Sequence, residues 1–156
     1  MDASVTDPEG RLRIEEQLCF ALYSTSRAIT REYVTLLEPL GVTYPQYLAL
    51  MVLWRRDGLM VQEIAASLEI DQATATPLVQ RLEKLGYVHR QRSREDERKV
   101  FVFLTERGKG LFASALGIPE ALGCAIGVTE EKAARLLAEL NTIKAFIAER
   151  KQSEDG

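Results

Sequence analysis

Two short helical patterns that lie close together and are followed at once by a strand pattern constrain the fold of this chain most. "VQEIAASL" (61–68) has apolar or small residues at helical spacing. After a connection of about three or four residues, Asp71 is placed to cap "QATATPLVQRLEKLG", where Leu78, Leu82 and Leu85 are expected on the buried side. Two helices joined so closely indicate a helix-turn-helix.

The segment that follows has the pattern of a β-hairpin. "YVHRQRS" alternates apolar and polar residues, "REDERK" is a charged turn, and "VFVFL" is rich in β-branched and aromatic residues. These patterns predict two strands, Tyr87–Arg92 and Lys99–Leu104, with a charged tip between them. A helix-turn-helix followed directly by a hairpin is a winged helix. The sequence therefore predicts a mainly α fold with a small β-hairpin wing.

Helical patterns flank this region on both sides. A first helix is expected over 12–37, and a second is expected to begin at "TYPQ", where Thr43 starts a Thr-x-x-Gln capping box, and to stop at Gly58. Thr105 is expected to cap a further helix, which leads into a stretch that glycine and proline interrupt, from Ile118-Pro119 to Gly123-Cys124.

Thr129 is expected to cap a last amphipathic helix. Its apolar stripe consists of Ala133, Leu136, Leu137, Leu140, Ile143 and Ile147. We interpret 1–156 as one protomer, in which 43–104 is the winged-helix region and 12–42 with 105–150 are dimerisation helices. Only the first ten residues and the final "KQSEDG" are expected to be disordered.

The distribution of charge favours a nucleic-acid partner, although the net charge is −3. From Arg81 to Lys109 there are nine Lys or Arg against five Asp or Glu, a local charge of +4 that leaves −7 for the rest of the chain. A basic block in an acidic protein is expected where one face meets phosphate.

The second helix of a helix-turn-helix reads bases with its N-terminal part in the major groove, and a wing contacts phosphate or the minor groove. Pro77, inside this helix, is expected either to fit a kink to packing or to set the angle of the reading end. Asp96 is placed to hold Arg98. The candidate DNA-binding residues are Asp71, Gln72, Thr74, Thr76, Gln80, Arg81, Arg90, Arg92, Arg94, Arg98 and Lys99.

Composition restricts the other classes of protein. No apolar run is long enough for a membrane span, and the acidic start does not resemble a secretory signal, so a cytoplasmic protein is expected. With two cysteines far apart and His89 as the single histidine, a zinc site has too few ligands, and no cofactor is expected. From position alone, Cys19 and Cys124 would be taken as buried packing residues.

The combination of "LCFALY", "TYPQYLAL", the helix-turn-helix and "RSREDERKV" resembles the MarR family of winged-helix repressors, and within it the organic hydroperoxide resistance regulators. The resemblance extends from about Leu12 to Ile147. The wing motif is shared across the family, whereas "QLCFALY" with "TYPQY" is specific to the peroxide-sensing branch. In the second helix, Gln72, Ala73 and Ala75 depart from the residues common there, which leaves the operator sequence open.

This resemblance implies a homodimer, held by the first and last helices, that binds a pseudo-palindromic operator. It implies that Cys19 is the peroxide-reactive cysteine and that Tyr33 and Tyr44 of the other subunit hydrogen-bond its sulfur. In the two-cysteine subtype a resolving cysteine lies between the last two helices, where this chain has Cys124. Oxidation would end in an intersubunit disulfide and release of DNA.

The residues around Cys19 agree in part with that chemistry. Leu18, Phe20 and Leu22 would suit an organic hydroperoxide, whereas Glu15 and Glu16 would oppose ionisation of the thiol. Two other functions stay open: a repressor that a small aromatic ligand releases, with structural cysteines, and a thiol peroxidase, for which no recycling motif is present. The first hypothesis, a redox-sensing repressor that is not an enzyme, is favoured.

Overall fold

The described part of the chain forms two compact units that meet between Leu116 and Gly117. The computed structural model describes residues 12–96 and 98–154, so all ten N-terminal residues that were expected to be disordered lie outside the described residues. The first unit contains η1 (Ile14–Glu16), α1 (Leu18–Leu37), η2 (Glu38–Leu40), α2 (Tyr44–Arg55), β1 (Leu59–Met60), α3 (Val61–Leu68), α4 (Gln72–Lys84), β2 (Val88–Arg92), β3 (Val100–Leu104) and α5 (Glu106–Ala115). The second contains α6 (Ile118–Ile126) and α7 (Glu130–Glu154).

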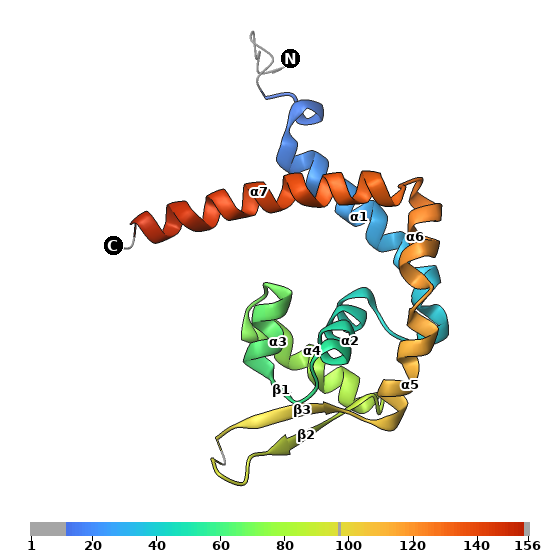
Figure 1. Cartoon of the computed structure of the whole chain (residues 1–156), viewed down its shortest axis with the longest axis vertical. Coiled ribbons are helices and arrows are strands. Elements are labelled where there is room, and N and C mark those ends of the chain that lie inside the picture. Colours follow the sequence, from blue (N-terminus) through green and yellow to red (C-terminus); the bar gives the residue numbers. More distant parts are fainter. Residues whose placement is uncertain (1–11, 97, 155–156) are drawn as a thin grey trace, which may run out of the picture. The chain divides into compact units, whose positions relative to one another are not determined.

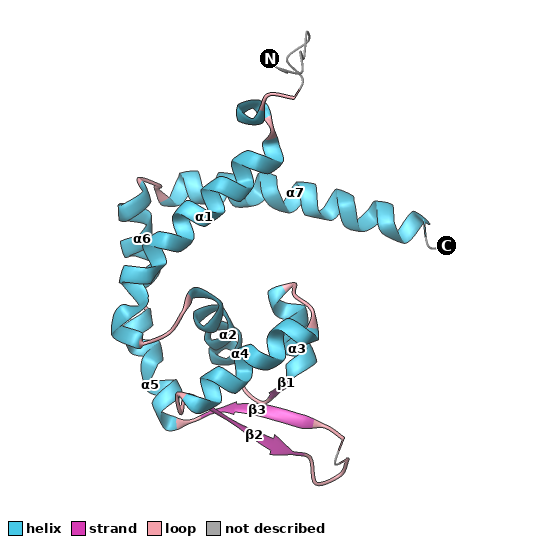
Figure 2. Cartoon of the chain, turned by 180° about the vertical axis from the view of Figure 1, so that it is seen from behind, coloured by secondary structure: helices cyan, strands magenta, loops and turns pink. Residues whose placement is uncertain are grey.

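A three-stranded antiparallel sheet lies at one end of the first unit. The strand order is β1-β3-β2, with His89 opposite Phe103 and Leu59 opposite Val102. The predicted hairpin is confirmed, but the prediction of two strands was incomplete, because β1 has only two residues and no pattern of its own. Figure 2 shows the helices α2, α3 and α4 on one side of this sheet, with the β2–β3 hairpin extending past them.

The helix-turn-helix of α3 and α4 packs on α2 and on the sheet. Its core contains Leu50 of α2, Ile64 of α3 and Val102 of β3, all with essentially no exposed surface. On α4 the buried residues are Ala75, Val79 and Leu82, at spacings of four and three. Of the three leucines expected on the buried side, Leu82 is buried, whereas Leu78 and Leu85 are only half-buried.

Four polar residues cap the helices as predicted. Gln46 accepts a hydrogen bond from the backbone N–H of Thr43 at 2.8 Å and completes the capping box of α2. Asp71 accepts from Thr74 N–H at 2.7 Å, and Thr105 accepts from Gly108 N–H at 3.1 Å. Thr129 accepts from the backbone N–H of Lys132 at 3.3 Å at the start of α7. These caps satisfy backbone donors that the first turn of a helix leaves free.

Two helix boundaries in the first unit differ from the prediction. The first helix does not begin at Leu12: residues 14–16 form a separate 3-10 turn, and Gln17 has an extended backbone (φ −86°, ψ 118°) before α1 starts. The second helix ends at Arg55 instead of Gly58, because Arg56 is extended and leads into β1. Apolar periodicity alone did not reveal either break.

The second unit is more regular than its glycines and proline suggest. Pro119 lies in the first turn of α6, where its missing N–H costs nothing, so the expected interruption is a continuous helix. The helix α7 continues to Glu154, further than expected, and none of its described residues is buried. Across the described residues no single helix is both long and apolar enough to cross a membrane.

Candidate functional site

The N-terminal part of α4 presents an exposed face beyond the core of the winged helix. Gln72, Ala73 and Thr74 are exposed in its first turn, and Gln80 and Arg81 are exposed two turns later. The opposite side of the helix is held by the buried stripe of Ala75, Val79 and Leu82. A helix fixed in this way can place its outer face in a major groove.

Three of the candidate DNA-binding residues hydrogen-bond within the helix. Thr74 donates its backbone N–H and its hydroxyl to Asp71, at 2.7 and 3.0 Å, and these bonds lower the pKa of Asp71. The hydroxyl of Thr76 donates to the carbonyl of Gln72 at 2.8 Å. These threonines can therefore offer a base a methyl group or an acceptor lone pair, while the Asp71 carboxylate serves as the helix cap.

The basic residues of the wing are held in two different ways. Arg98 donates to Asp96 through its Nε at 3.4 Å and its backbone N–H at 3.1 Å, as the sequence predicted. Arg90 is bound to Glu83 on α4, a partner that the sequence did not reveal because it depends on how the wing packs against the helix. The side chains with no hydrogen bond or ion pair to the described residues are Arg92, Arg94 and Lys99.

Cys19 is the second residue of α1 and is exposed, so it is not a buried packing residue within the protomer. The glutamates at 15 and 16 lie on the separate 3-10 turn, and Glu16 faces Arg13 at 3.8 Å. Gln17, the residue that precedes α1, makes no capping hydrogen bond with its side chain, and the N-terminal end of a helix favours negative charge. The apolar residues beside the thiol are Leu18 (61% exposed), Phe20 (39%) and Leu22 (41%).

Tyr33 and Tyr44 form a close pair between α1 and α2. Their ring centroids are 4.3 Å apart, and Tyr47 lies 5.9 Å from Tyr33. Burial, with smaller contributions from Tyr44 and Tyr47, raises the pKa of Tyr33 to about 12, and burial also raises the pKa of Tyr44. Both phenols therefore keep their protons near neutral pH. Neither hydroxyl has a hydrogen-bond partner among the described residues.

An aromatic row continues from this pair toward α5. Tyr47 lies edge-on to Trp54 at 6.2 Å, and Trp54 lies edge-on to Phe112 at 5.7 Å. The indole N–H of Trp54 donates to the carbonyl of Gly108 at 3.0 Å. Trp54, which is half-buried, thus joins α2 to α5.

Cys124 lies within α6, three residues before the left-handed Gly127 that ends the helix, and it is exposed. It belongs to the second unit, whereas Cys19 belongs to the first. The sequence had placed it in an interrupted segment, and the structure places it on a helix. Across the described residues no group of three His, Cys, Asp or Glu side chains could hold a metal ion.

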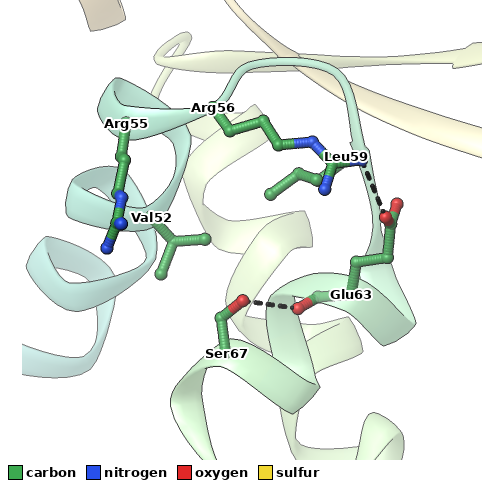
Figure 3. A pocket seen from close by; sticks show the side chains of 6 residues that line it. All are labelled: Val52, Arg55, Arg56, Leu59, Glu63 and Ser67. Carbon is green, nitrogen blue, oxygen red and sulfur yellow. Dashed lines mark hydrogen bonds and ion pairs between the residues drawn. The ribbon is translucent and has the colours of Figure 1, made fainter.

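An open hollow of about 550 Å³ lies between α2, β1 and α3 (Figure 3). Arg56 spans it to reach Glu63 at 3.1 Å, and Ser67 donates to the carbonyl of Glu63 at 2.8 Å. Its apolar lining consists of Val52 and Leu59, with no aromatic side chain. It is therefore a poor match for an aromatic ligand.

An exposed recognition helix, a basic wing and a sheet at the base define a winged-helix protein, the class that reads DNA in the major groove. Comparison with known proteins agrees. The family described as transcriptional regulator SarA/Rot matches residues 32–114. The chain is 43% identical over 138 residues to the HTH-type transcriptional regulator TtmR of Methylorubrum extorquens (strain PA1), covering 88% of this chain and 69% of that protein.

It is also 43% identical over 120 residues to the organic hydroperoxide resistance transcriptional regulator of Bacillus subtilis (strain 168), covering 77% of this chain and 80% of the relative. Two solved structures of AbfR, a protein of Staphylococcus epidermidis, are similar at 31% identity. Overoxidised AbfR bound to DNA gives a TM-score of 0.70 over 86% of this chain and 95% of that one. Disulfide-formed AbfR gives a TM-score of 0.61 over 87% of this chain and 93% of the AbfR chain.

The chain belongs to the SarA/Rot and MarR-type family of winged-helix transcriptional regulators. The predicted fold class is thereby confirmed, as is the resemblance to the organic hydroperoxide resistance regulators.

Proposed function

We propose that this regulator is a redox-sensing repressor, whose homodimer binds operator DNA while Cys19 is reduced and releases it when an organic hydroperoxide oxidises Cys19. One observation carries the proposal: an exposed thiol with an apolar rim lies in the first turn of α1 in a winged-helix chain. The names of similar proteins support it, since one is an organic hydroperoxide resistance regulator and AbfR has been solved in overoxidised and disulfide-formed states.

The exposed face of α4 would contact base edges, with Gln72 and Gln80 suited to adenine and Arg81 suited to guanine or phosphate. The side chains of Arg92, Arg94 and Lys99, which have no hydrogen bond or ion pair with the described residues, would neutralise phosphates beside the groove. A dimer would place two such helices on half-sites roughly 34–36 Å apart, which explains why a pseudo-palindromic operator is expected.

Exposed apolar residues on α1 and α7 support the homodimer. Val34 is 71% exposed on α1, while Leu137 is 60% and Phe146 69% exposed on α7. Large apolar side chains at this density on a monomer mark a surface that another chain covers. A second copy is the expected occupant, so 12–42 and 105–150 are proposed as dimerisation segments around the winged-helix region 43–104.

The chemistry begins with the thiolate of Cys19. The positive end of α1 would stabilise its charge, and the protonated phenols of Tyr33 and Tyr44, which have no partner among the described residues, would donate hydrogen bonds to the sulfur of the other subunit. The separation of Glu15 and Glu16 onto η1 removes them from the helix that carries the thiol. The apolar rim would hold the organic part of the hydroperoxide.

Two balanced steps would follow. The sulfur of Cys19 attacks the terminal oxygen of the hydroperoxide, the O–O bond breaks, and the alkoxide leaves and takes up a proton, so a sulfenic acid and an alcohol form. The thiol of Cys124 from the other subunit then displaces water from the sulfenic sulfur and forms a disulfide. This bond requires the two Cα atoms to come within about 7 Å of each other. Any helix movement needed to reach that distance would alter the spacing of the recognition helices and release DNA.

A gel-shift experiment on DNA from the protein's own promoter region tests the sensor. Wild type should release the DNA on addition of cumene hydroperoxide, and Cys19→Ser should bind DNA but stay bound when the oxidant is added. Release of Cys19→Ser by the hydroperoxide would remove Cys19 from the mechanism and favour a repressor that responds to a ligand.

Non-reducing gels test the second step separately. Oxidised wild type should run as a covalent dimer that dithiothreitol separates, whereas Cys124→Ser should stay monomeric on the gel. A covalent dimer of Cys124→Ser would show that Cys124 is not the resolving thiol.

A further inference from the structure

Arg90 lies among the basic residues of the wing, but its contacts differ from theirs. Its backbone N–H donates to Oε1 of Glu83 at 3.0 Å, and its Nε donates to Oε2 at 2.8 Å. Arg90 therefore donates a hydrogen bond to each carboxylate oxygen of Glu83. Glu83 belongs to the last turn of α4 and Arg90 to the middle of β2, so the contact joins the recognition helix to the wing.

The strand order explains why the backbone takes part. β2 is an edge strand, because β3 lies between it and β1. Edge strands have N–H groups with no neighbouring strand to accept them. Glu83 supplies the acceptor for the N–H of Arg90, and it does so from the helix packed beside the strand. The side chains are 40% and 33% exposed, so the pair is partly shielded from water.

Arg92 provides an internal comparison on the same strand. Residues two apart on a strand point to the same side, so Arg90, opposite Val102, and Arg92, opposite Val100, share one face. Both border a shallow hollow of about 270 Å³ beside Glu83. Arg92 is exposed and has no hydrogen bond or ion pair with the described residues. Two arginines of one strand thus differ chiefly in whether a carboxylate neutralises them.

We propose that Arg90 is a positioning residue, which holds the wing on the recognition helix through Glu83 and contacts no phosphate. The proposal rests on DNA binding as proposed above. A cation that contacts phosphate displaces condensed counterions from DNA, whereas an arginine already neutralised by a carboxylate adds no net charge to the interface. The salt dependence of binding therefore separates the two roles, although either arginine can change affinity.

The experiment compares Arg90→Gln with Arg92→Gln in the full-length protein. Fluorescence anisotropy measures binding to a duplex of about 30 base pairs, selected from a random library by the wild type, at salt from roughly 50 to 200 mM. We expect Arg92→Gln to reduce the slope of log K against log[salt] by about 0.9 per protomer. We expect Arg90→Gln to weaken binding about fivefold, because it leaves the carboxylate of Glu83 unpaired beside the DNA. Arg90→Gln/Glu83→Gln has the same net charge as the wild type, so it should recover part of the affinity and keep the wild-type slope.

A slope for Arg90→Gln/Glu83→Gln that falls as far as that of Arg92→Gln would overturn the proposal, because Arg90 would then contact phosphate. If binding of the wild type to DNA does not depend on salt, that result would contradict the proposed DNA binding instead.

A measurement without DNA tests the contact between Glu83 and Arg90 by itself. Hydrogen exchange at the Arg90 amide should accelerate about fivefold or more in Glu83→Ala, and should not change in the neighbouring control Lys84→Ala. Equal exchange in Glu83→Ala and wild type would show that the contact does not hold the wing.

Discussion

At the scale of single residues, packing changes the acid–base chemistry of Tyr33 and Tyr44. Tyr33 and Tyr44 come from different helices, and their rings pack 4.3 Å apart. Burial in this pair disfavours the phenolate, and negative charge on the neighbouring tyrosines would repel it further, so the pKa of Tyr33 rises to about 12 from 10.0. A tyrosine that remains neutral is a dependable hydrogen-bond donor, which is the property that the proposed contact to sulfur needs.

The raised pKa predicts how stability changes at alkaline pH. Because the folded state holds the Tyr33 proton more tightly than the unfolded state, this stabilisation is complete below about pH 10 and is lost as pH rises toward 12. Urea unfolding of wild type and Tyr33→Phe at about pH 9 and about pH 11 checks the prediction. Between these two pH values the wild type should lose more of its free energy of unfolding than Tyr33→Phe does. Equal losses in both proteins would contradict the assignment.

At the scale of the elements, the first turn of α5 lies very close to its neighbours. A Cβ at Gly108 would lie 2.0 Å from the carbonyl oxygen of Tyr87, a contact that only glycine permits. The hydroxyl of Thr105 donates to the carbonyl of Gly86 at 2.6 Å, and Trp54 bonds Gly108 from the other side. The helix that leads out of the wing is thereby packed tightly against the winged helix.

Two glycines on α5 provide a matched test of this packing. Gly108→Ala should lower the free energy of unfolding by about 2–3 kcal/mol, since backbone must move to admit the methyl group. Gly110 has nothing within 4 Å of its added Cβ, so Gly110→Ala should be neutral or raise stability by about 0.5–1 kcal/mol. Urea unfolding monitored by circular dichroism measures both. A loss in Gly110→Ala as large as in Gly108→Ala would show that helix propensity, and not the close approach, decides the effect.

For the whole molecule, the main feature is the apolar surface that the protomer leaves exposed. No described residue of α7 is buried, although its stripe includes Leu136, Leu137 and Ile143, which are 49%, 60% and 42% exposed. A 25-residue helix with so little burial gains stability from a partner, because isolated helices are marginal in water. Dimerisation is therefore proposed as part of the fold as well as part of DNA recognition.

Leu137→Glu/Ile143→Glu should weaken the dimer by on the order of 100-fold, because two charges per protomer would enter an apolar interface. Sedimentation velocity measures the association, and Arg135→Glu, a charge change away from the stripe, is the control. The thermal unfolding of the winged helix should be retained, since neither residue is buried in the protomer. An unchanged dimer would place the interface elsewhere.

The sequence by itself determined the features that depend on neighbours along the chain. The helix-turn-helix, the hairpin, the four caps and the basic block all follow from periodicity, turn residues and charge within short windows, and the structure agrees with each. The hydrogen bond between Asp96 and Arg98 could be predicted for the same reason, because the two residues are close in the sequence. The reactive role of Cys19 came from a family resemblance, since position alone favoured packing.

Only the tertiary structure decided what depends on contacts between distant segments. It paired the two residues of β1 with β3, placed Gly108 against Tyr87, and joined Arg90 to Glu83. It also brought Tyr33 and Tyr44 into contact, which sets their protonation. None of these contacts leaves a periodic pattern in the sequence, because each depends on how two separately formed elements pack. For this protein, local patterns were sufficient to identify the winged helix, whereas three-dimensional packing decided which of its charged and phenolic groups are free to act.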